Sequence, residues 1–208
     1  MAFPFAATIA AQAGPQTAFL RSGADICIYG GAAGGGKTAG LILEPLRHAG
    51  RVANFTAVFF RRTMPQITNP GALWDESLKF YPRLGGTPHL RMREWRWRRG
   101  GKIKFAHLQF ETTVYDWQGA QITLICFDEL THFSAHQFFY MVSRNRSTCG
   151  VRLISVRPAT RMPTRGSPTS FPGGSTRRVG IRSPSGPACC AILSALAKRS
   201  CGPIDPKT

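Results

Sequence analysis

The sequence predicts an α/β fold with a mainly parallel sheet in residues 1–150, followed by a basic, low-complexity tail in residues 151–208. In the first part, short apolar runs alternate with segments of helical periodicity, and a run of glycines joins the first strand-like run to the first helical one. The second part holds 8 of the chain's 15 prolines and 10 of its 27 Lys and Arg residues, without sustained periodicity. We therefore expect one partial α/β domain and a disordered tail.

Apolar runs rich in β-branched and aromatic residues predict three buried strands, and a Gly-Gly pair predicts a hairpin. The expected strands are Asp25–Tyr29, Asn54–Arg61 and Ile122–Phe127, and the two hairpin strands are Leu90–Arg99 and Lys102–Phe110. The expected helices are Lys37–Ala49, Gly71–Tyr81 and Ser134–Ser147, with Ala188–Leu196 as a short helical candidate in the tail.

The net charge of +17 favours a polyanionic partner, with nucleic acid ahead of an anionic membrane surface. No apolar run of about 18 residues is present, so no membrane-spanning helix is expected. A break at Pro4 and the lack of a basic residue before Arg21 argue against a secretory signal. Six cysteines without a C-x-x-C pair indicate a reducing compartment, no zinc site and no disulfide framework, and Cys27 and Cys126 are expected to be buried.

The glycine run matches the phosphate-loop pattern G-x-x-x-x-G-K-[ST]. Glycines let backbone N–H groups turn toward phosphate oxygens, which side chains would obstruct. Lys37 would then reach the β- and γ-phosphates of ATP, and Thr38 would bind Mg²⁺. The alternative is a glycine-rich turn with a chance Lys-Thr pair. The candidate cofactor-binding residues of this loop are Gly31, Gly34, Gly35, Gly36, Lys37 and Thr38.

The strand expected at Ile122–Phe127 runs directly into two carboxylates, Asp128 and Glu129. A buried strand would deliver them at its carboxyl end, where α/β sheets bind ligands. Asp128 is the candidate Mg²⁺ ligand, and Glu129 is the candidate catalytic residue that orients and deprotonates the attacking water. The alternative is an ordinary strand end with solvated acids.

The hairpin LRMREWRWRRGGKIKF, residues 90–105, alternates arginines and lysines with tryptophans. Its cations could bind phosphates while the indoles stack on bases. Equally, the tryptophans could cover the core while the arginines are merely solvated. A binding role would concern the nucleic-acid backbone rather than its sequence.

Three segments, residues 15–38, 59–77 and 115–147, together resemble the large terminase subunit of tailed bacteriophages, the ATPase that drives DNA into capsids. The resemblance covers residues 10–150 and implies a P-loop NTPase fold of the ASCE, RecA-like type with ATP and Mg²⁺ as cofactors. It also implies double-stranded DNA, a portal and a small terminase subunit as partners, a homo-oligomeric ring, and a location in the bacterial host cytoplasm away from membranes. The alternatives are a non-functional prophage remnant and another P-loop DNA motor such as a helicase.

The resemblance also assigns roles to individual residues. Gln16 would lie near the adenine, and Arg61 and Arg62 near the nucleotide, with Arg62 as a catalytic residue. Gln118-Gly119 would precede the acidic strand. Arg144 and Arg146 match an Arg-x-Arg segment and would act as an arginine finger, a DNA contact or cations at a helix end, while His132 is expected to be structural.

The tail lacks the Thr-x-Asn-Pro-like coupling motif that the resemblance places after Arg-x-Arg. Back-translation with permitted codons and one restored C converts residues 153–166 to PYIRATCNPDADSW, which contains T-C-N-P. We therefore expect a single-nucleotide loss near Arg152 to put residues 153–208 out of frame, the alternative being a genuine basic DNA-binding tail. On this hypothesis the chain lacks the nuclease domain and the coupling motif, and its sheet lacks later strands.

Overall fold

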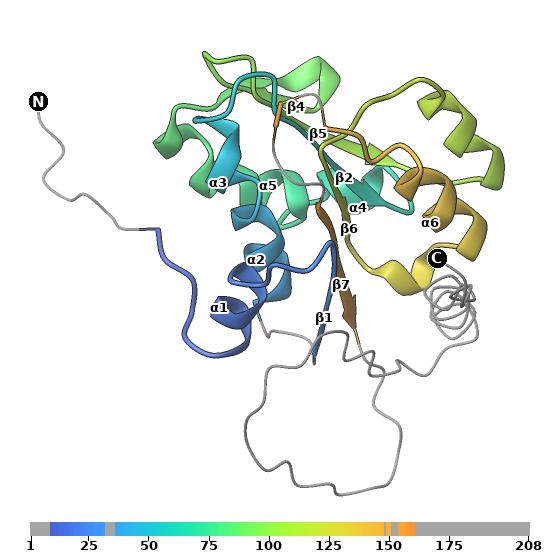
Figure 1. Ribbon diagram of the computed structural model, residues 1–208, viewed down its shortest axis with the longest axis horizontal. Helices are drawn as coiled ribbons and strands as arrows, with labels where there is room; N and C mark the ends of the chain where they lie inside the picture. The colour runs from blue at the N-terminus through green and yellow to red at the C-terminus, as the bar shows by residue number, and fades with distance from the viewer. Residues whose placement is uncertain (1–8, 32–35, 148, 151–153, 161–208) are drawn as a thin grey trace, which may run out of the picture.

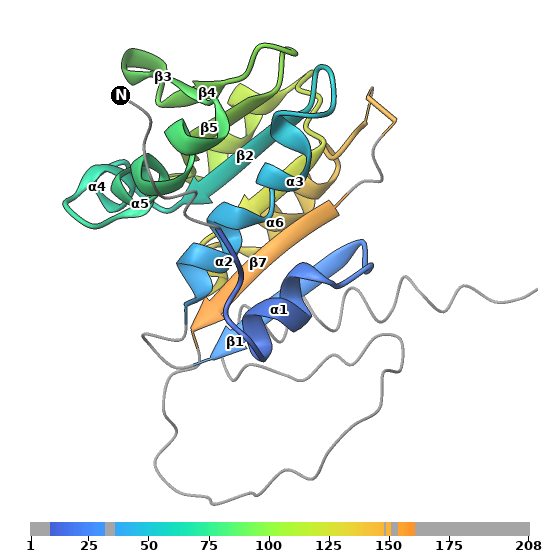
Figure 2. The same cartoon turned by 90° about the vertical axis from the view of Figure 1, so that its left-hand side faces the viewer.

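The computed structural model describes residues 9–31, 36–147, 149–150 and 154–160, so the helix expected at Ala188–Leu196 lies outside the described residues. These residues form a seven-stranded sheet with helices on both faces (Figures 1 and 2). The strands are β1 Ile26–Gly31, β2 Thr56–Arg61, β3 Thr87–His89, β4 Glu94–Arg96, β5 Lys102–His107, β6 Leu124–Phe127 and β7 Ile154–Thr160. The α-helices are α1 Pro15–Leu20, α2 Lys37–Leu43, α3 Leu46–Ala49, α4 Pro65–Thr68, α5 Leu73–Phe80 and α6 Ala135–Val142. The 3₁₀ helices are η1 Pro82–Leu84, η2 Leu90–Met92, η3 Glu111–Trp117 and η4 Leu130–His132.

The sheet has the strand order β1-β7-β6-β2-β5-β4-β3. Neighbouring strands from β1 to β5 are parallel, whereas β4 and β3 add antiparallel strands at one side. The parallel strands therefore end along one edge of the sheet, here called the carboxyl edge, and start along the opposite amino edge. The arrowheads of β2 and β7 point toward the same side in Figure 2. Ligand sites of α/β sheets lie at the carboxyl edge.

The three predicted strands are confirmed as β1, β2 and β6, with ends that differ by up to two residues, but β1 lies at the sheet edge and is half-buried rather than buried. Their side chains alternate between two cores. On one face, Phe59 and Cys126 join a cluster covered by helices of the α1–α5 region. On the other face, Phe60 and Phe127 pack with α6. Figure 1 shows α1, α2, α3 and α5 on one side of the sheet and α6 on the other.

The cysteines expected inside the domain do line the core. Cys126 is fully buried and Cys27 is half-buried against the same cluster, and burial raises the pKa of both thiols. Within the described part of the chain, no helix is long and apolar enough to cross a membrane.

The predicted helix Lys37–Ala49 is wrong as a single element, because the chain forms α2 and then α3 with a turn at Glu44 and Pro45. Proline lacks an N–H group and its ring clashes with the carbonyl of the preceding turn, which ends α2. The predicted helix Gly71–Tyr81 is confirmed as α5. Helix α4, a single turn that starts at a proline, is an addition to the predicted helices.

The predicted helix Ser134–Ser147 starts as expected but ends at Val142. Ser134 caps it by accepting a 3.1 Å hydrogen bond from the Gln137 N–H. The end is early because Asn145 forms a bridge with Ile122 and donates from its side-chain amide to the Ile122 carbonyl at 2.9 Å. Pairing with the sheet thus replaces the last predicted helical turn.

The largest correction concerns the tail. Residues 154–160, expected to be disordered, form β7 between β1 and β6, so the sheet does not end with β6. The proline at position 158 is unfavourable for a strand in the sheet interior. It lies beyond Ile154–Val156, the three residues of β7 that pair on both sides, and a missing N–H is least costly where only one neighbour is paired. The rest of the tail, residues 161–208, lies outside the described residues.

The predicted Gly100-Gly101 hairpin is confirmed, with strands β4 and β5 shorter than expected. Its tryptophans are core residues: Trp95 is fully buried and Trp97 is 7% exposed. The Trp95 indole donates to Ser77 Oγ at 2.9 Å, and that of Trp97 to the Leu84 carbonyl at 2.9 Å. Of the two interpretations, stacking of these indoles on bases is wrong.

The hairpin turn lies against the end of α3. A Cβ atom on Gly101 would lie 2.1 Å from the Ala49 carbonyl oxygen, so no side chain fits without backbone movement. At Gly23, by contrast, a Cβ atom would meet nothing within 4 Å.

We predict that Gly101→Ala lowers the free energy of unfolding by about 1–3 kcal/mol or more, because it overpacks a backbone contact. Gly23→Ala should change it by less than about 1 kcal/mol. Urea unfolding followed by tryptophan fluorescence measures both. Equal stability of the two variants would contradict the close approach at Gly101.

Candidate functional site

The loop between β1 and α2 lies at the carboxyl edge. β1 ends at Gly31, and α2 begins at Lys37 directly after Gly36. Gly36 has a φ of 68°, a left-handed conformation that favours glycine. A Cβ atom there would also lie 3.1 Å from the side-chain amides of Gln12 and Gln16. The predicted phosphate-loop residues Gly34 and Gly35 lie outside the described residues.

Gln16 on α1 is tied to this loop. It is 3% exposed, and its Nε2 donates to the Gly36 carbonyl at 2.9 Å. Its Oε1 accepts a 2.6 Å hydrogen bond from the Gln12 N–H. The amide predicted to contact adenine therefore holds the N-terminal segment against the end of the loop.

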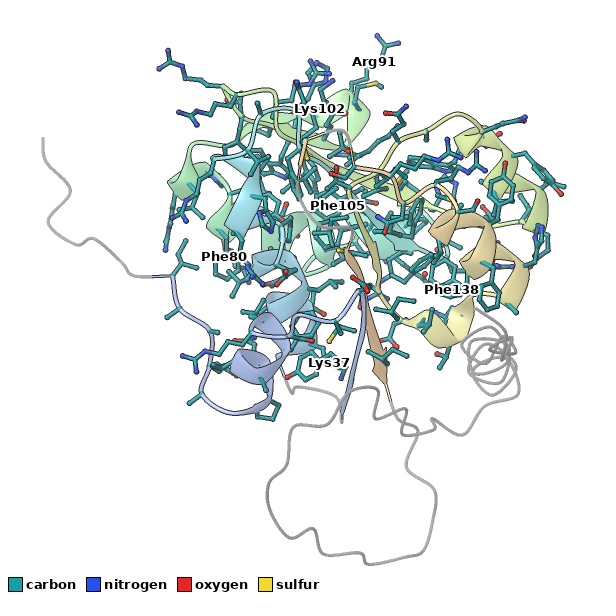
Figure 3. The ribbon with its side chains drawn as sticks, viewed as in Figure 1. Lys37, Phe80, Arg91, Lys102, Phe105 and Phe138 are labelled. Carbon is teal, nitrogen blue, oxygen red and sulfur yellow. The ribbon has the colours of Figure 1, made fainter. Side chains whose placement is uncertain are left out.

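The two polar residues that open α2 differ in burial. Lys37 is 9% exposed, and Thr38 is half-buried. Figure 3 shows Lys37 beside the ends of β1 and β7. The sequence therefore places an ammonium group and a hydroxyl next to the start of the loop helix, as the motif requires.

Asp128 follows β6 and is held from β2. It is 2% exposed, its N–H donates to the Phe60 carbonyl at 3.0 Å, and its Oδ2 accepts a 2.6 Å hydrogen bond from Arg61 Nε. Arg61 Nη2 forms an ion pair with the same oxygen. Burial raises the pKa of the Asp128 carboxyl, and the Arg61 guanidinium opposes that rise. A buried carboxylate is thus compensated by one cation that approaches a single oxygen.

Glu129 is held in an unusual backbone conformation. Its φ and ψ angles are 56° and 61°, in the left-handed region, and it caps η4. For a residue with a side chain this conformation costs roughly 1–2 kcal/mol. Such strain concentrates at functional sites. The half-buried Glu129 side chain therefore leaves the sheet edge on a strained turn directly after the buried Asp128.

β7 sets the separation of these two groups. Because it lies between β1 and β6, the strand before the loop and the strand before Asp128 are two strand spacings apart, about 9.5 Å. The composition of the tail concealed this strand from prediction.

Arg62, the third predicted catalytic residue, is engaged away from Asp128. Its Nη1 donates to Gln137 Oε1 at 2.8 Å. Gln137 is fully buried on α6, and its Nε2 donates to the carbonyls of Leu108 and Phe110 at 3.1 and 3.0 Å. Gln137 thus joins α6 to the segments that follow β2 and β5. Its only signal in the sequence is its place three residues after a helix-capping serine.

The Arg-x-Arg pair does not reach this site within one chain. The backbones of Arg144 and Arg146 hydrogen-bond with Ile122, just before β6, at the amino edge. The Arg144 guanidinium lies 5.2 Å from the centre of the Tyr140 ring. An arginine finger in this segment would therefore have to act on the nucleotide of a neighbouring chain.

The remaining predicted residues lie at the surface. His132 is exposed on η4, and within the described residues it makes no side-chain hydrogen bond, so the structural role expected for it is not observed. Gln118 and Gly119 are exposed and, as predicted, precede β6.

The donor set at the carboxyl edge fits a magnesium–nucleotide complex. Thr38 and Asp128 would supply oxygen ligands, which Mg²⁺ prefers, and Lys37 would supply a cation for phosphate. Among the described residues, no group of three or more His, Cys, Asp or Glu side chains could hold a metal ion by itself.

Comparison with known proteins supports the fold independently. A large terminase from a thermophilic bacteriophage is similar over 72% of this chain and 36% of its own, with a TM-score of 0.50 and 13% identity. The HK97 bacteriophage large terminase is similar over 70% of this chain and 32% of its own, with a TM-score of 0.51 and 18% identity. The chain thus spans about a third of the length of these structures.

Among curated proteins, none matches the sequence. A family model does, and it is described as terminase large subunit, T4likevirus-type, N-terminal. It matches residues 28–163, more than half of the chain, which include the last four residues of β1, the loop, Asp128 and β7. The chain therefore belongs to the T4likevirus-type terminase large subunit family, and it matches the N-terminal part of that subunit.

Proposed function

We propose that this chain is the ATP-hydrolysing part of a bacteriophage DNA-packaging motor. The observation that carries the proposal is the convergence of Lys37 and Thr38, after β1, with Asp128 and Glu129, after β6, at the carboxyl edge of one sheet. The motor context rests on family membership.

In this proposal each residue has a separate task. Backbone N–H groups of the loop and the Lys37 ammonium bind the phosphates, and Gln16 borders the base. Thr38 and Asp128 would hold Mg²⁺, which neutralises charge on the phosphates. Glu129 orients the attacking water and accepts its proton. Arg62, fixed by Gln137, lies after β2 and would stabilise charge on the transferred group.

Arg61 has a role in the state before ligand binding. A carboxylate that is 2% exposed needs compensation, and Arg61 provides it through two contacts to Oδ2. We infer that Arg61 keeps Asp128 ionised and oriented until the cation arrives, and then shares or releases it.

The functions of the whole motor are proposed from family membership alone. Coupling of hydrolysis to translocation of double-stranded DNA, assembly into a ring, and contacts with a portal and a small subunit in the host cytoplasm are proposed from the family. A helicase-like motor has no observation in its favour here. An inactive remnant remains an outcome of the first test below.

We expect the full chain to be stabilised against thermal unfolding by Mg²⁺ with ATP, by about 2.7 kcal/mol at a ligand concentration of 100 Kd. Lys37→Ala should abolish both this stabilisation and ATP hydrolysis, whereas Arg21→Gln, an exposed cation outside the site, should retain them. Differential scanning fluorimetry and phosphate release measure the two effects. Normal turnover by Lys37→Ala would refute the site, and a wild-type chain without nucleotide stabilisation would identify a remnant.

The left-handed backbone at Glu129 predicts a difference in stability that can be measured without an activity assay. Glu129→Gly should unfold at higher denaturant than Glu129→Ala, by about 1 kcal/mol, because both lose the carboxylate but only glycine relaxes the left-handed backbone. Guanidinium unfolding of the two variants measures this. Both should hydrolyse no ATP, so a stabilised Glu129→Gly variant with normal turnover would separate Glu129 from the chemistry.

The reading frame of the tail is tested at the level of the gene. β7 and the family match both extend past Arg152 in the present frame. The proposed frame break near Arg152 predicts one additional C when codons 148–156 are resequenced from the original DNA. An unchanged sequence would mean either that the frame break is real in the gene or that the tail is in its original frame, and ATP binding by the 208-residue chain would then be the deciding measurement.

A further inference from the structure

The amino edge of the sheet, opposite the candidate nucleotide site, carries a group of exposed cations. Two lie in the hairpin turn, one opens β5 directly after that turn, one follows α3 and one follows α6, so three separate parts of the chain contribute. We call them the amino-edge cluster; its members are Arg51, Arg98, Arg99, Lys102 and Arg146.

Hydrogen bonds fix these parts of the chain to one another. Arg99 Nη1 donates to the Arg51 carbonyl at 3.0 Å, and the Asn54 N–H donates to the Arg99 carbonyl at 3.2 Å. The N–H of Lys102 donates to the Phe55 carbonyl at 2.7 Å, which places the start of β5 beside the start of β2. Arg146 donates from its N–H to the Ile122 carbonyl, just before β6. The cluster therefore spans the amino ends of β5, β2 and β6, about 10 Å of sheet width.

Within the described residues, none of the five cluster cations forms an ion pair. The acids nearest the hairpin in sequence are engaged elsewhere: Glu94 pairs with Arg96, and Glu111 accepts a 2.7 Å hydrogen bond from the Ser134 hydroxyl. Five cations on a rigid edge without acidic partners form a concentrated positive field, which binds polyanions.

The character of this edge indicates which polyanion fits. The hairpin tryptophans are buried, and the exposed aromatic residues of the described chain, Phe110 and Tyr115, lie outside the cluster. Proteins that bind single strands stack bases on exposed aromatic rings, whereas a duplex offers phosphates, one charge per about 1.7 Å of axis. The absence of rings from the cluster favours double-stranded nucleic acid read through its backbone.

We infer that the amino-edge cluster is a sequence-independent contact for the phosphate backbone of double-stranded DNA. The inference rests on the proposed motor function and deepens it by naming the surface that holds the substrate. β2 connects this surface with the nucleotide site: Thr56 pairs with Lys102 at one end, and Arg61 binds Asp128 at the other, about 17 Å away. Figure 3 shows Lys102 and Lys37 far apart in the molecule.

The test compares two variants of equal charge in the full chain. Arg98→Gln/Lys102→Gln removes two cluster cations, and Arg21→Gln/Lys79→Gln removes two exposed cations elsewhere. Fluorescence anisotropy with labelled duplexes of about 30 base pairs and two unrelated sequences gives Kd from about 50 to 200 mM salt. The cluster variant should bind both duplexes at least about tenfold more weakly at about 0.1 M salt, and the slope of log K against log salt should fall by about 2. The control should change little.

Several outcomes would overturn the inference. Equal losses in both variants would reduce the effect to net charge, and full binding by the cluster variant would assign DNA binding to other parts of the chain, including residues 161–208. Tighter binding to a single-stranded oligonucleotide, or to vesicles containing phosphatidylserine, would identify a different partner. Nucleotide-induced stabilisation of the same samples separates these failures from failure of the nucleotide site, and Arg98→Lys/Lys102→Arg should restore binding if the charge is what matters.

Discussion

The arrangement of the site depends on one strand, β7, which pairs with β1 on one side and with β6 on the other. Its backbone fixes the distance between the loop that would bind phosphate and the carboxylates that would act on it. Without it, β1 would lose its only strand neighbour in the described sheet, and the two halves of the site would have no common frame. The relative positions of the four side chains, on which the proposed chemistry depends, are therefore set by the order of the strands in the sheet.

Buried polar groups then orient the site from outside it. Asp128 is held by a backbone bond from β2 and by Arg61, and Arg62 is held by Gln137, whose own amide is fully bonded. Each of these groups would be costly if left unpaired, so each has one defined arrangement. Gln16 fixes the end of the loop in the same way, because its buried side chain hydrogen-bonds with both Gln12 and Gly36. The two arginines at the end of β2, Arg61 and Arg62, thus serve two different partners, which their adjacency in the sequence does not reveal.

Three strands and the positions of the loop and the two acids could be predicted from the sequence, and the physical reason differs between elements. The strands β2 and β6 are continuous apolar runs because both of their faces are buried, β1 is a half-buried apolar run at the sheet edge, and the loop and Asp128-Glu129 directly follow β1 and β6. The break at Pro45 and the early end of α6 depend on a proline ring and on a bridge between Asn145 and Ile122, two residues from different elements. β7 was missed because its proline and arginine belong to a composition typical of disorder, and only pairing with β1 and β6 compensates for them. The hairpin tryptophans had two equally good interpretations until their partners, Ser77 and Leu84, were known.

The pairing of β6 has a mechanical meaning. β6 pairs with β2 over four residues and with β7 over only three, the shortest of the parallel ladders in the described sheet. Beyond Cys126 the strand pairing of β6 in the described sheet is with β2, through Phe127, and the Asp128 N–H and Arg61 continue this attachment. The strands β1-β7 are thus joined to β6-β2-β5 by one ladder of three residue pairs, which stops before the acids. The distance between the loop and Asp128 therefore depends on the shortest parallel ladder of the described sheet, whose hydrogen bonds are each worth about 1 kcal/mol.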